Sequence, residues 1–479
     1  MIRAAATAST REAARAGAEI LRAGGNAVDA AVATALASCV ADPCNIGIGG
    51  YGGYLVVHQR GGQARCVQFP LCAPEGITSS ALARAYPEEG PECSSVPGVA
   101  GGLARALAEL GRLSWDRVSE PAIRLARDGV AASTTMRRAL EQNRERRFIA
   151  ECFEIDQSPH GLTFRQPALA ITLERMAEQG PQWFREGPLG EAACRAWAEA
   201  GVPVSVDEWR RQHQSAEVVD ASLHEDGGVR LWGAPVELSG AGCVFAIVAA
   251  ARRIGPGALA TDRGLADLAA EMARVWQWRL GAASLPMEVA HTAHLNTVDG
   301  DGMAAALTAT QGPAWFGGRW AIPGSGVIMN AGMHNFTRGG FVARAGRKLG
   351  VSNMSPTIAV DAIGDRVLVG CPGARRIPSN IALVLARHLV MGRPLQESVS
   401  AGRFHAEDPA CIAFEDGRTT ADLLAELRQR FAAVEPQARD DYFGPLTAIR
   451  IARSGEVEAA VDDRDAVGHA ATIDDEEGI

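Results

Sequence analysis

The spacing of hydrophobic positions divides the chain into a helix-rich first part and a strand-rich second part, with the change near residue 291. Apolar residues at helical spacing, such as Leu169, Leu173 and Met176, predict helices. The predicted helices are one that ends at Gly24-Gly25, then 27–41, 103–110, 115–128, 168–178, 189–200, 243–252, 264–281, 379–391 and 419–432. Short apolar or alternating runs predict strands at 54–57, 64–69, 229–232, 292–298, 303–310, 326–330, 356–361, 366–370, 446–452 and 456–461.

This order of elements favours one α+β unit, in which stacked sheets lie between helical layers. We find no internal repeat and no long linker in the 479 residues. Residues 185–188 are predicted to be a loop, the stretch 204–228 is polar, and the acidic residues 474–477 are typical of a solvated chain end.

Capping patterns mark the first two helices. Ser9-Thr10-Arg11-Glu12 has the spacing of a capping box and begins the first helix. Asn26 begins the second helix, with Asp29 in the first turn, where a carboxylate suits the helix dipole. Both helices are rich in alanine, so little side chain separates them and close packing is expected.

The glycine-rich run Gly47-Ile48-Gly49-Gly50-Tyr51-Gly52-Gly53 contains a formal G-x-G-x-x-G pattern. A dinucleotide site needs a strand before this pattern and a helix after it, whereas here a helix precedes and a strand follows. We therefore expect the glycines to let backbone segments approach closely or to line a cavity floor.

Residues 292–298 and 304–310 read as two strands joined by the turn Asp299-Gly300-Asp301-Gly302. This can be a buried hairpin and nothing more. Alternatively, Thr292 is a hidden N-terminus: the chain cuts itself before this residue, and the freed threonine supplies both a nucleophile and a base.

Four sequence blocks favour the second interpretation. They are GGNAVDAAVA at 24–33, TAH at 292–294, MSPTI at 354–358 and PGARRI at 372–377, with a weaker match at 403–405. With these blocks in this order, the chain resembles the γ-glutamyltranspeptidase family across nearly all of its length. The resemblance implies a four-layer αββα Ntn-hydrolase sandwich. It also implies cleavage between His291 and Thr292, giving a large segment, 1–291, and a small segment, 292–479, that together form one structural domain.

The resemblance also implies a catalytic set. A threonine hydroxyl is a weak nucleophile until a base removes its proton, and the α-amine of Thr292, with an ordinary pKa near 8, can be that base. Thr310 would hold the Thr292 side chain, and the backbone N–H groups of Gly373 and Ala374 would form the oxyanion hole. Ser352 and Asn353 fall at substrate-contacting positions.

The positions that choose the substrate depart from the family pattern. Pro70 stands where the family has an arginine for the α-carboxylate of a glutamyl group, and Asn335 stands where it has an aspartate for the α-amine. Gly312 replaces a usual asparagine. Arg375 is an addition: it either binds a substrate carboxylate or is paired internally. His334 is also new, and a structural role is expected for it.

Loss of both charged partners predicts a substrate other than a plain γ-glutamyl amide. We expect a self-processing threonine hydrolase that cleaves an amide or related acyl bond through an acyl-enzyme, with an oxo-acid or oxalyl-type group as one version. The alternatives are a γ-glutamyl hydrolase or transferase with a rearranged clamp, a C–C bond hydrolase of secondary metabolism such as antibiotic biosynthesis, and an unprocessed, non-catalytic homologue.

Composition limits the partners and the location. The 47 basic and 56 acidic residues give 47 − 56 = −9, which argues against a nucleic-acid surface. No apolar run approaches the roughly 18 residues of a membrane span. The run Met1-Ile2-Arg3-Ala4-Ala5 lacks a signal-peptide pattern, so a cytoplasmic protein is predicted. The expected partners are a small acyl or amide substrate and the two segments of one cut chain, with a homodimer left open.

No cofactor or metal is predicted. The ten cysteines form no Cys-x-x-Cys pair and are expected to be buried thiols rather than zinc ligands or disulfides. Cys371, in Gly370-Cys371-Pro372-Gly373, lies near the candidate site in sequence and is expected to pack rather than to act as a nucleophile.

Overall fold

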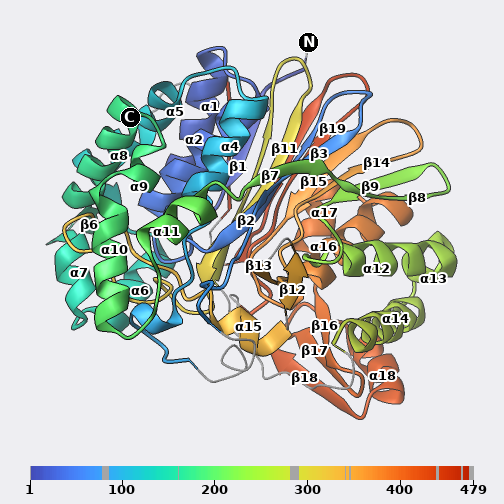
Figure 1. Cartoon of the computed structure of the whole chain (residues 1–479). Coiled ribbons are helices and arrows are strands. Elements are labelled where there is room, and N and C mark those ends of the chain that lie inside the picture. Colours follow the sequence, from blue (N-terminus) through green and yellow to red (C-terminus); the bar gives the residue numbers. More distant parts are fainter. Residues whose placement is uncertain are drawn as a thin grey trace.

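Two antiparallel sheets lie face to face in the computed structural model, and helices cover both outer faces (Figure 1). The structure describes residues 2–77, 86–159, 161–280, 291–339, 341–344, 347–437, 442–464 and 468–473. The layers follow in the order helix, sheet, sheet, helix, which confirms the predicted four-layer αββα sandwich of an α+β chain.

The first sheet has seven strands, in the spatial order β21 (His469–Thr472), β1 (Ala5–Ala8), β10 (His291–Val298), β11 (Ala304–Gly312), β2 (Gly52–His58), β3 (Ala64–Phe69) and β7 (Glu217–Asp220). The second has six, in the order β20 (Val457–Val461), β19 (Thr447–Ile451), β15 (Arg366–Gly370), β14 (Thr357–Val360), β9 (Val229–Gly233) and β8 (Ser222–Asp226). An apolar core that includes Val56, Ala306, Ile358 and Ile449 fills the space between them.

Most of the helices divide between the two outer layers. The first group is α1 (Arg11–Arg22), α2 (Ala27–Ala41), α4 (Val99–Leu110), α5 (Trp115–Asp128), α6 (Thr134–Asn143), α7 (Arg147–Cys152), α8 (Pro167–Gln179), α9 (Trp183–Glu186), α10 (Pro188–Glu199) and α11 (Val206–His213). In it, α1, α2 and α4 contact the first sheet directly. The helices beside the second sheet are α12 (Ala241–Ile254), α13 (Pro256–Leu259), α14 (Asp262–Leu280), α16 (Arg376–Leu385) and α17 (Leu395–Ser400).

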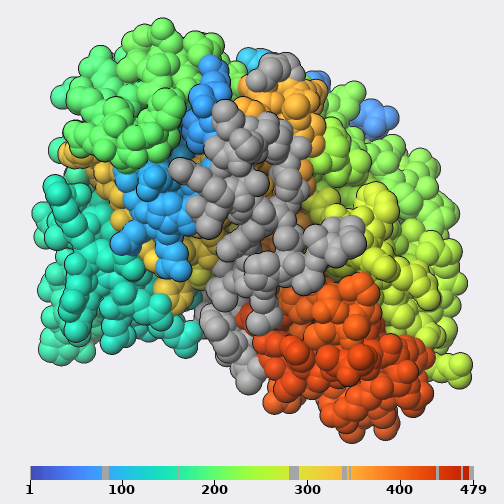
Figure 2. All heavy atoms as spheres, turned by 60° about the horizontal axis from the view of Figure 1, so that its bottom comes forward, coloured from blue at the N-terminus to red at the C-terminus, as the bar shows by residue number. Residues whose placement is uncertain are grey.

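Smaller elements complete the chain. They are η1 (Pro91–Cys93), α15 (His334–Gly339), the hairpin β12 (Phe341–Arg344) and β13 (Arg347–Gly350), and the sheet β4 (Val130–Ala131), β6 (Gly161–Arg165) and β5 (Glu154–Ser158). Strands β16 (Phe404–Asp408), β17 (Cys411–Glu415) and β18 (Ala433–Gln437) and helix α18 (Ala421–Arg430) form an orange-red lobe beside α14, which Figure 2 shows at one corner of the molecule.

Most predicted elements form within a few residues of their predicted bounds, but 326–330 is not a strand. It has only one isolated bridge, between Ala321 and Ile328. Gly324 and Gly326 both have positive φ, so the chain turns here, and the apolar Val327 and Met329 pack into the helix-side core. An apolar run identified a buried segment correctly but not its conformation.

Two stretches with no predicted helix contain helices. The polar stretch 204–228 forms α11, β7 and β8, because Ser205 caps α11 by accepting from the Glu208 N–H, and Trp209 buries one face. The predicted loop 185–188 overlaps the end of α9. Similarly, the helix predicted over 379–391 is α16 followed by a π-helical turn, η2 (Ala386–Val390).

The first two helices pack as closely as their small residues allow. Thr10, rather than Ser9, caps α1, while the Ser9 hydroxyl donates to Asp42. Asn26 and Asp29 form the capping box of α2, every residue of which is buried. A Cβ on Gly17 of α1 would lie 2.3 Å from the Thr34 hydroxyl of α2, so this crossing requires glycine.

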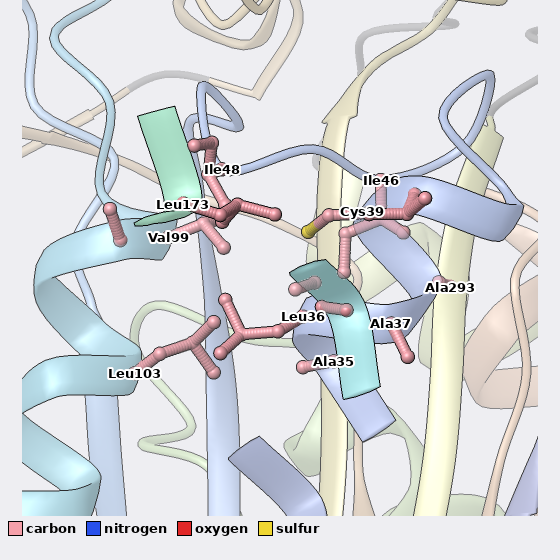
Figure 3. Packing of buried hydrophobic residues seen from close by; sticks show 14 of the residues in the cluster. Ala35, Leu36, Ala37, Cys39, Ile46, Ile48, Val99, Leu103, Leu173 and Ala293 are labelled. Carbon is pink, nitrogen blue, oxygen red and sulfur yellow. The ribbon is translucent and has the colours of Figure 1, made fainter. Parts of the chain in front are cut away.

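The two faces of β10 have different environments. Ala293 and Leu295 belong to the helix-side core together with residues of α2 such as Ala37 and Cys39 (Figure 3). Strand residues alternate between faces, so Thr292, His294 and Asn296 point toward the second sheet. The end of β10 that carries Thr292 therefore opens between the two sheets. Separately, no helix within the described ranges is long and apolar enough to cross a membrane.

Candidate active site

A small cavity of about 40 Å³ lies where β10 begins and β11 ends. Six of the predicted site residues line it: Thr292, Thr310, Asn335, Ser352, Asn353 and Ala374. The other lining residues are Tyr51, Gly312, Pro313, His334, Met354 and Ile377. None of the described lining residues is a lysine, arginine, aspartate or glutamate, so the cavity is polar but carries no formal side-chain charge.

Thr292 and Thr310 face each other across the β10–β11 pair, and both are buried. The Thr310 hydroxyl donates to the carbonyl oxygen of His291 at 2.6 Å and accepts from the Gly312 N–H at 3.1 Å. The strand register shifts between His291 and Thr292. The bond before Thr292 therefore lies at an irregularity of the ladder, with a hydroxyl donor on its carbonyl.

Tyr51 is a part of the site that sequence reasoning did not single out. Its side chain forms hydrogen bonds with the side chains of Thr310 and Asn335, and burial outweighs them and raises the pKa of Tyr51 to about 12. The phenol is thus neutral near pH 7 and able to donate. Its only sequence signal is its place in the glycine-rich run before β2, where a Cβ on Gly50 would lie 2.8 Å from the Thr310 carbonyl oxygen.

Gly373 and Ala374 form a turn directly before α16. Both have positive φ, 125° and 52°, and their carbonyls accept from the N–H groups of Arg376 and Ile377. Within the described residues, neither the Gly373 nor the Ala374 N–H has an acceptor. Successive backbone N–H groups in such a turn form an anion-binding concavity, which suits a developing oxyanion. Ala374 lines the cavity, and Gly373 precedes it.

The Arg279 guanidinium holds both Ser352 and Asn353 in place. Arg279 of α14 donates to the Ser352 carbonyl at 2.8 Å and to the Asn353 side-chain oxygen at 3.3 Å. The Ser352 hydroxyl accepts from the Met354 N–H at 3.3 Å. These contacts leave both side chains on the cavity wall in set orientations.

His334 and Asn335 begin α15 and also line the cavity. The Asn335 amide donates to the Gly332 carbonyl at 3.4 Å, in addition to its contact with Tyr51. The His334 ring is hydrogen-bonded to the Pro87 carbonyl at 3.1 Å, and burial lowers its pKa. A neutral, carbonyl-bound histidine matches the structural role expected for it.

Pro70 and Arg375 do not line the cavity. The Arg375 guanidinium pairs with Glu407 at 3.0 Å, and the two side chains are 6% and 11% exposed. The Tyr442 hydroxyl donates to the same carboxylate. This is the internally paired alternative for Arg375. Pro70 follows β3 and packs against Gly98: a Cβ added to Gly98 would lie 3.0 Å from the Pro70 carbonyl oxygen.

A buried polar chain supports β10 behind the cavity. His294 is hydrogen-bonded to the Thr308 hydroxyl at 2.8 Å and to the Asn296 side-chain oxygen at 3.0 Å. Asn296 in turn donates to the Thr447 carbonyl, on the second sheet, at 3.1 Å. Burial lowers the pKa of His294 to about 4, so the ring is neutral near pH 7. These bonds fix the orientation of β10 against both neighbouring strands.

The cysteines add no second nucleophile here. All ten are free, and burial raises the pKa of Cys371 to about 12, so its thiol stays protonated near pH 7. It donates to the Ile377 carbonyl at 3.8 Å. Across the part of the chain that the structure describes, no group of three or more His, Cys, Asp or Glu residues could hold a metal ion.

Comparison with known proteins identifies the family to which this chain is similar. The sequence model of the family described as gamma-glutamyltranspeptidase matches residues 13–261 and 263–472. The glutathione hydrolase proenzyme of Escherichia coli (strain K12) is 26% identical over 523 aligned residues, covering 94% of this chain and 88% of that protein. Glutathione hydrolase proenzyme 1 of Schizosaccharomyces pombe is 27% identical, covering 86% of this chain and 76% of that protein.

Among solved structures, the chain is similar to cephalosporin acylase from Bacillus halodurans, with a TM-score of 0.82. The match covers 98% of this chain and 96% of the acylase at 21% sequence identity, so it establishes the shared fold.

Proposed function

The chain belongs to the γ-glutamyltranspeptidase family, and we propose that it cleaves itself between His291 and Thr292 to become an N-terminal threonine acyl hydrolase or transferase. The two products would be the segments 1–291 and 292–479, which stay together as one structural domain. That both the bacterial and the yeast relative are named proenzymes supports such processing.

The observation that carries the proposal is the hydrogen bond from Thr310 to the His291 carbonyl beside Thr292. In self-cleavage, the Thr292 hydroxyl attacks the His291 carbonyl carbon, and the carbonyl oxygen becomes negative. Thr310, donating to that oxygen at 2.6 Å, stabilises the charge. The amide nitrogen takes up the proton lost by the hydroxyl and becomes the Thr292 α-amine, and water then hydrolyses the ester that is left.

After cleavage, the same residues act on external substrates. The freed amine removes the Thr292 hydroxyl proton as this oxygen attacks the acyl carbon. The N–H groups of Gly373 and Ala374, which have no acceptor among the described residues, support an oxyanion hole. The leaving amine takes the proton, and water or another amine then attacks the acyl-enzyme ester at Thr292.

For the substrate, we propose an acyl group without the γ-glutamyl zwitterion. The described lining residues offer hydroxyl and amide groups, from Tyr51, Ser352, Asn353 and Asn335, but no charge for a carboxylate or an ammonium group. The oxo-acid version stays a prediction that requires Arg375 to turn from Glu407 toward the cavity.

Processing is tested by intact-mass measurement of purified protein. Wild type should give fragments of 291 and 188 residues (479 − 291), the smaller one beginning at Thr292. Thr292→Ala should stay whole and inactive, and Thr292→Ser, which keeps a hydroxyl, should still be cut. Cleavage of the alanine variant before residue 292 would refute the nucleophile assignment, and an uncut, inert wild type would favour a non-catalytic homologue.

The acyl group is tested on processed enzyme with matched anilides. We expect release from an uncharged short-chain acyl anilide to exceed release from the γ-glutamyl anilide by about 10²-fold in kcat/KM, which is the effect of about 3 kcal/mol in binding a charged group without its partner. Equal or faster γ-glutamyl turnover would instead show a rearranged clamp. Oxamate should become a better substrate in Glu407→Gln only if the released Arg375 reaches the site.

A further inference from the structure

A second cavity, of about 390 Å³, lies at the opposite end of the sandwich from Thr292. Strand β2 connects the two places: Gly52 pairs with Thr310 beside the candidate active site, and His58 lines the second cavity. Six residues of extended strand separate them by roughly 20 Å. In Figure 1 this end carries the β10–β11 turn and the N-terminus, whereas α15 lies at the other end.

Four arginines from separate turns and strand ends surround this cavity. Arg60 follows β2, Arg230 lies in β9, Arg366 begins β15 and Arg453 follows β19. None of them forms an ion pair with a described carboxylate, although the net charge of the chain is −9. Such a grouping is unfavourable without a counter-charge, because the guanidinium groups repel one another.

Acidic residues nearby are already engaged. Asp361 is the one carboxylate among the described lining residues, and its Oδ1 accepts from the N–H groups of Ile363 and Asp365. Asp299 acts on Arg366 only as a longer-range charge and accepts from the N–H groups of Ala27 and Met303. The cavity therefore keeps a net positive charge.

The arginines retain donors for a ligand. Arg366 is buried and donates to the Gly302 carbonyl at 2.5 Å, and burial together with Arg60 lowers its pKa to about 10. Arg60 donates to the Arg453 carbonyl at 3.3 Å, and the Arg230 guanidinium lies over the Trp232 ring at 5.1 Å. Each guanidinium has five N–H donors, so these contacts leave several unused.

His58 is an independent sign of a ligand. Its side chain is 2% exposed, packs against the Trp232 ring at 4.6 Å, and has no hydrogen-bond partner for Nδ1. Burial, with Arg366 and Arg230, lowers the pKa of His58 to about 4. Buried polar atoms are rarely left without a partner, and this one belongs to a residue that lines the cavity.

We propose that this cavity binds a small polyvalent oxyanion of the phosphate class, such as a diphosphate group. Guanidinium groups donate in pairs to phosphate oxygens, and four of them from different elements fit a ligand with several charged oxygens better than a single monovalent ion. The volume suits a small molecule. The arginines come from turns of both sheets, so a bound diphosphate would tie the sheets together and raise the melting temperature.

The test uses the full-length Thr292→Ala protein, whose state does not depend on processing, so it is separate from the test of the proposed function. Pyrophosphate is titrated by calorimetry into this protein and into two further variants. The double variant Arg60→Gln/Arg453→Gln removes two cavity arginines that are exposed to solvent. Arg195→Gln/Arg210→Gln is the matched control, with two exposed arginines on α10 and α11.

We expect the protein to bind pyrophosphate at one saturable site. The affinity should fall at least about tenfold in the cavity variant and stay unchanged in the control variant, and added salt should weaken binding. Melting temperatures without ligand show whether each variant is folded. Absence of saturable binding at millimolar pyrophosphate, or equal affinity in the cavity variant, overturns the proposal. Tighter binding of citrate than of pyrophosphate overturns the phosphate class.

Discussion

At the scale of single residues, Thr310 has the sharpest role to test. Replacing it with valine keeps the shape but removes the hydroxyl that donates to the His291 carbonyl. Loss of one such donor to a developing oxyanion slows a reaction by about 10²–10³-fold. We therefore expect fragments to appear slowly in Thr310→Val and at nearly normal speed in Thr310→Ser, followed on denaturing gels. Normal cleavage of the valine variant would remove Thr310 from the mechanism.

Tyr51 should act as a neutral positioning group rather than as a base. Because its pKa is raised to about 12, it keeps its proton throughout the working range, and the pH–rate profile should show no limb from it. Tyr51→Phe removes the hydrogen bonds to Thr310 and Asn335, so kcat/KM should fall by about tenfold with an unchanged profile. Steady-state kinetics from pH 6 to 10 on processed enzyme test this. A limb that vanishes in the variant would instead show that Tyr51 titrates in catalysis.

Sequence reasoning placed those parts of the candidate site that are close along the chain or belong to a recognised sequence block. Thr292 and Thr310 lie on adjacent strands of one hairpin, and the Gly373-Ala374 turn keeps its two N–H groups available. The role of Arg375 stayed open in the sequence because its partner, Glu407, comes from another element, and nothing local reveals that pair. Tyr51 was missed for the same reason: only the folded sheet brings it to Thr310.

At the scale of elements, caps and periodicity were the reliable signals. Asn26 caps α2 with Asp29 in its first turn, and β10 and β11 form a hairpin, as the sequence predicts, whereas the capping box predicted at Ser9–Glu12 is replaced by a cap from Thr10. Strands such as β1 and β21 could not be predicted, because Ala-rich segments of four residues have little strand preference. They form through pairing: β21 pairs with β1, and β1 also pairs with β10. The apolar run 326–330 failed because burial alone does not distinguish a strand from a turn between glycines.

The crossing of α1 and α2 gives a prediction at this scale. Gly17→Ala places a methyl group 2.3 Å from the Thr34 hydroxyl and 2.9 Å from the Ala6 Cβ, so it should destabilise the protein by about 1–3 kcal/mol. Gly257→Ala in α13 is the control, because no atom lies within 4 Å of the place that its Cβ would take, and it should be neutral or slightly stabilising. Urea unfolding measures both. Equal stability of the two variants would mean that the helices can move apart at little cost.

At the scale of the whole molecule, folding buries several titratable groups, in the first sheet, in the helices beside it and in β16. His58 and His294 lie on the first sheet, His213 ends α11, and His405 lies in β16. Burial is the largest cause that lowers the pKa of each, to about 4 for His58 and His294, to about 3 for His213, and well below the usual value for His405. Asp42 acts oppositely, because burial raises its pKa to about 6, and the pKa of Glu208 is also raised.

These shifts predict that stability falls as pH drops from 7 to 5. The four histidines are neutral when folded but take up protons at about pH 6.5 when unfolded, so their contribution is present above pH 6.5 and lost below it. Asp42, with a folded pKa of about 6, holds a proton near pH 5 in the folded state and offsets about one of the four, and the raised pKa of Glu208 acts in the same direction. The net uptake of about two to three protons lowers the free energy of unfolding by about 3–4 kcal/mol per pH unit near pH 5.

Urea unfolding of the uncut Thr292→Ala protein at several pH values measures this slope, and two variants should change it in opposite directions. His213→Leu removes one histidine that has no hydrogen-bond partner, so the slope should become shallower by about one proton. Asp42→Asn removes a group that holds its proton in the folded state, so the slope should become steeper by up to one proton near pH 5. If stability stayed constant or rose as the pH dropped from 7 to 5, the histidines would have to be hydrated or paired with a charged group in solution. The tight packing around these side chains would then be incorrect.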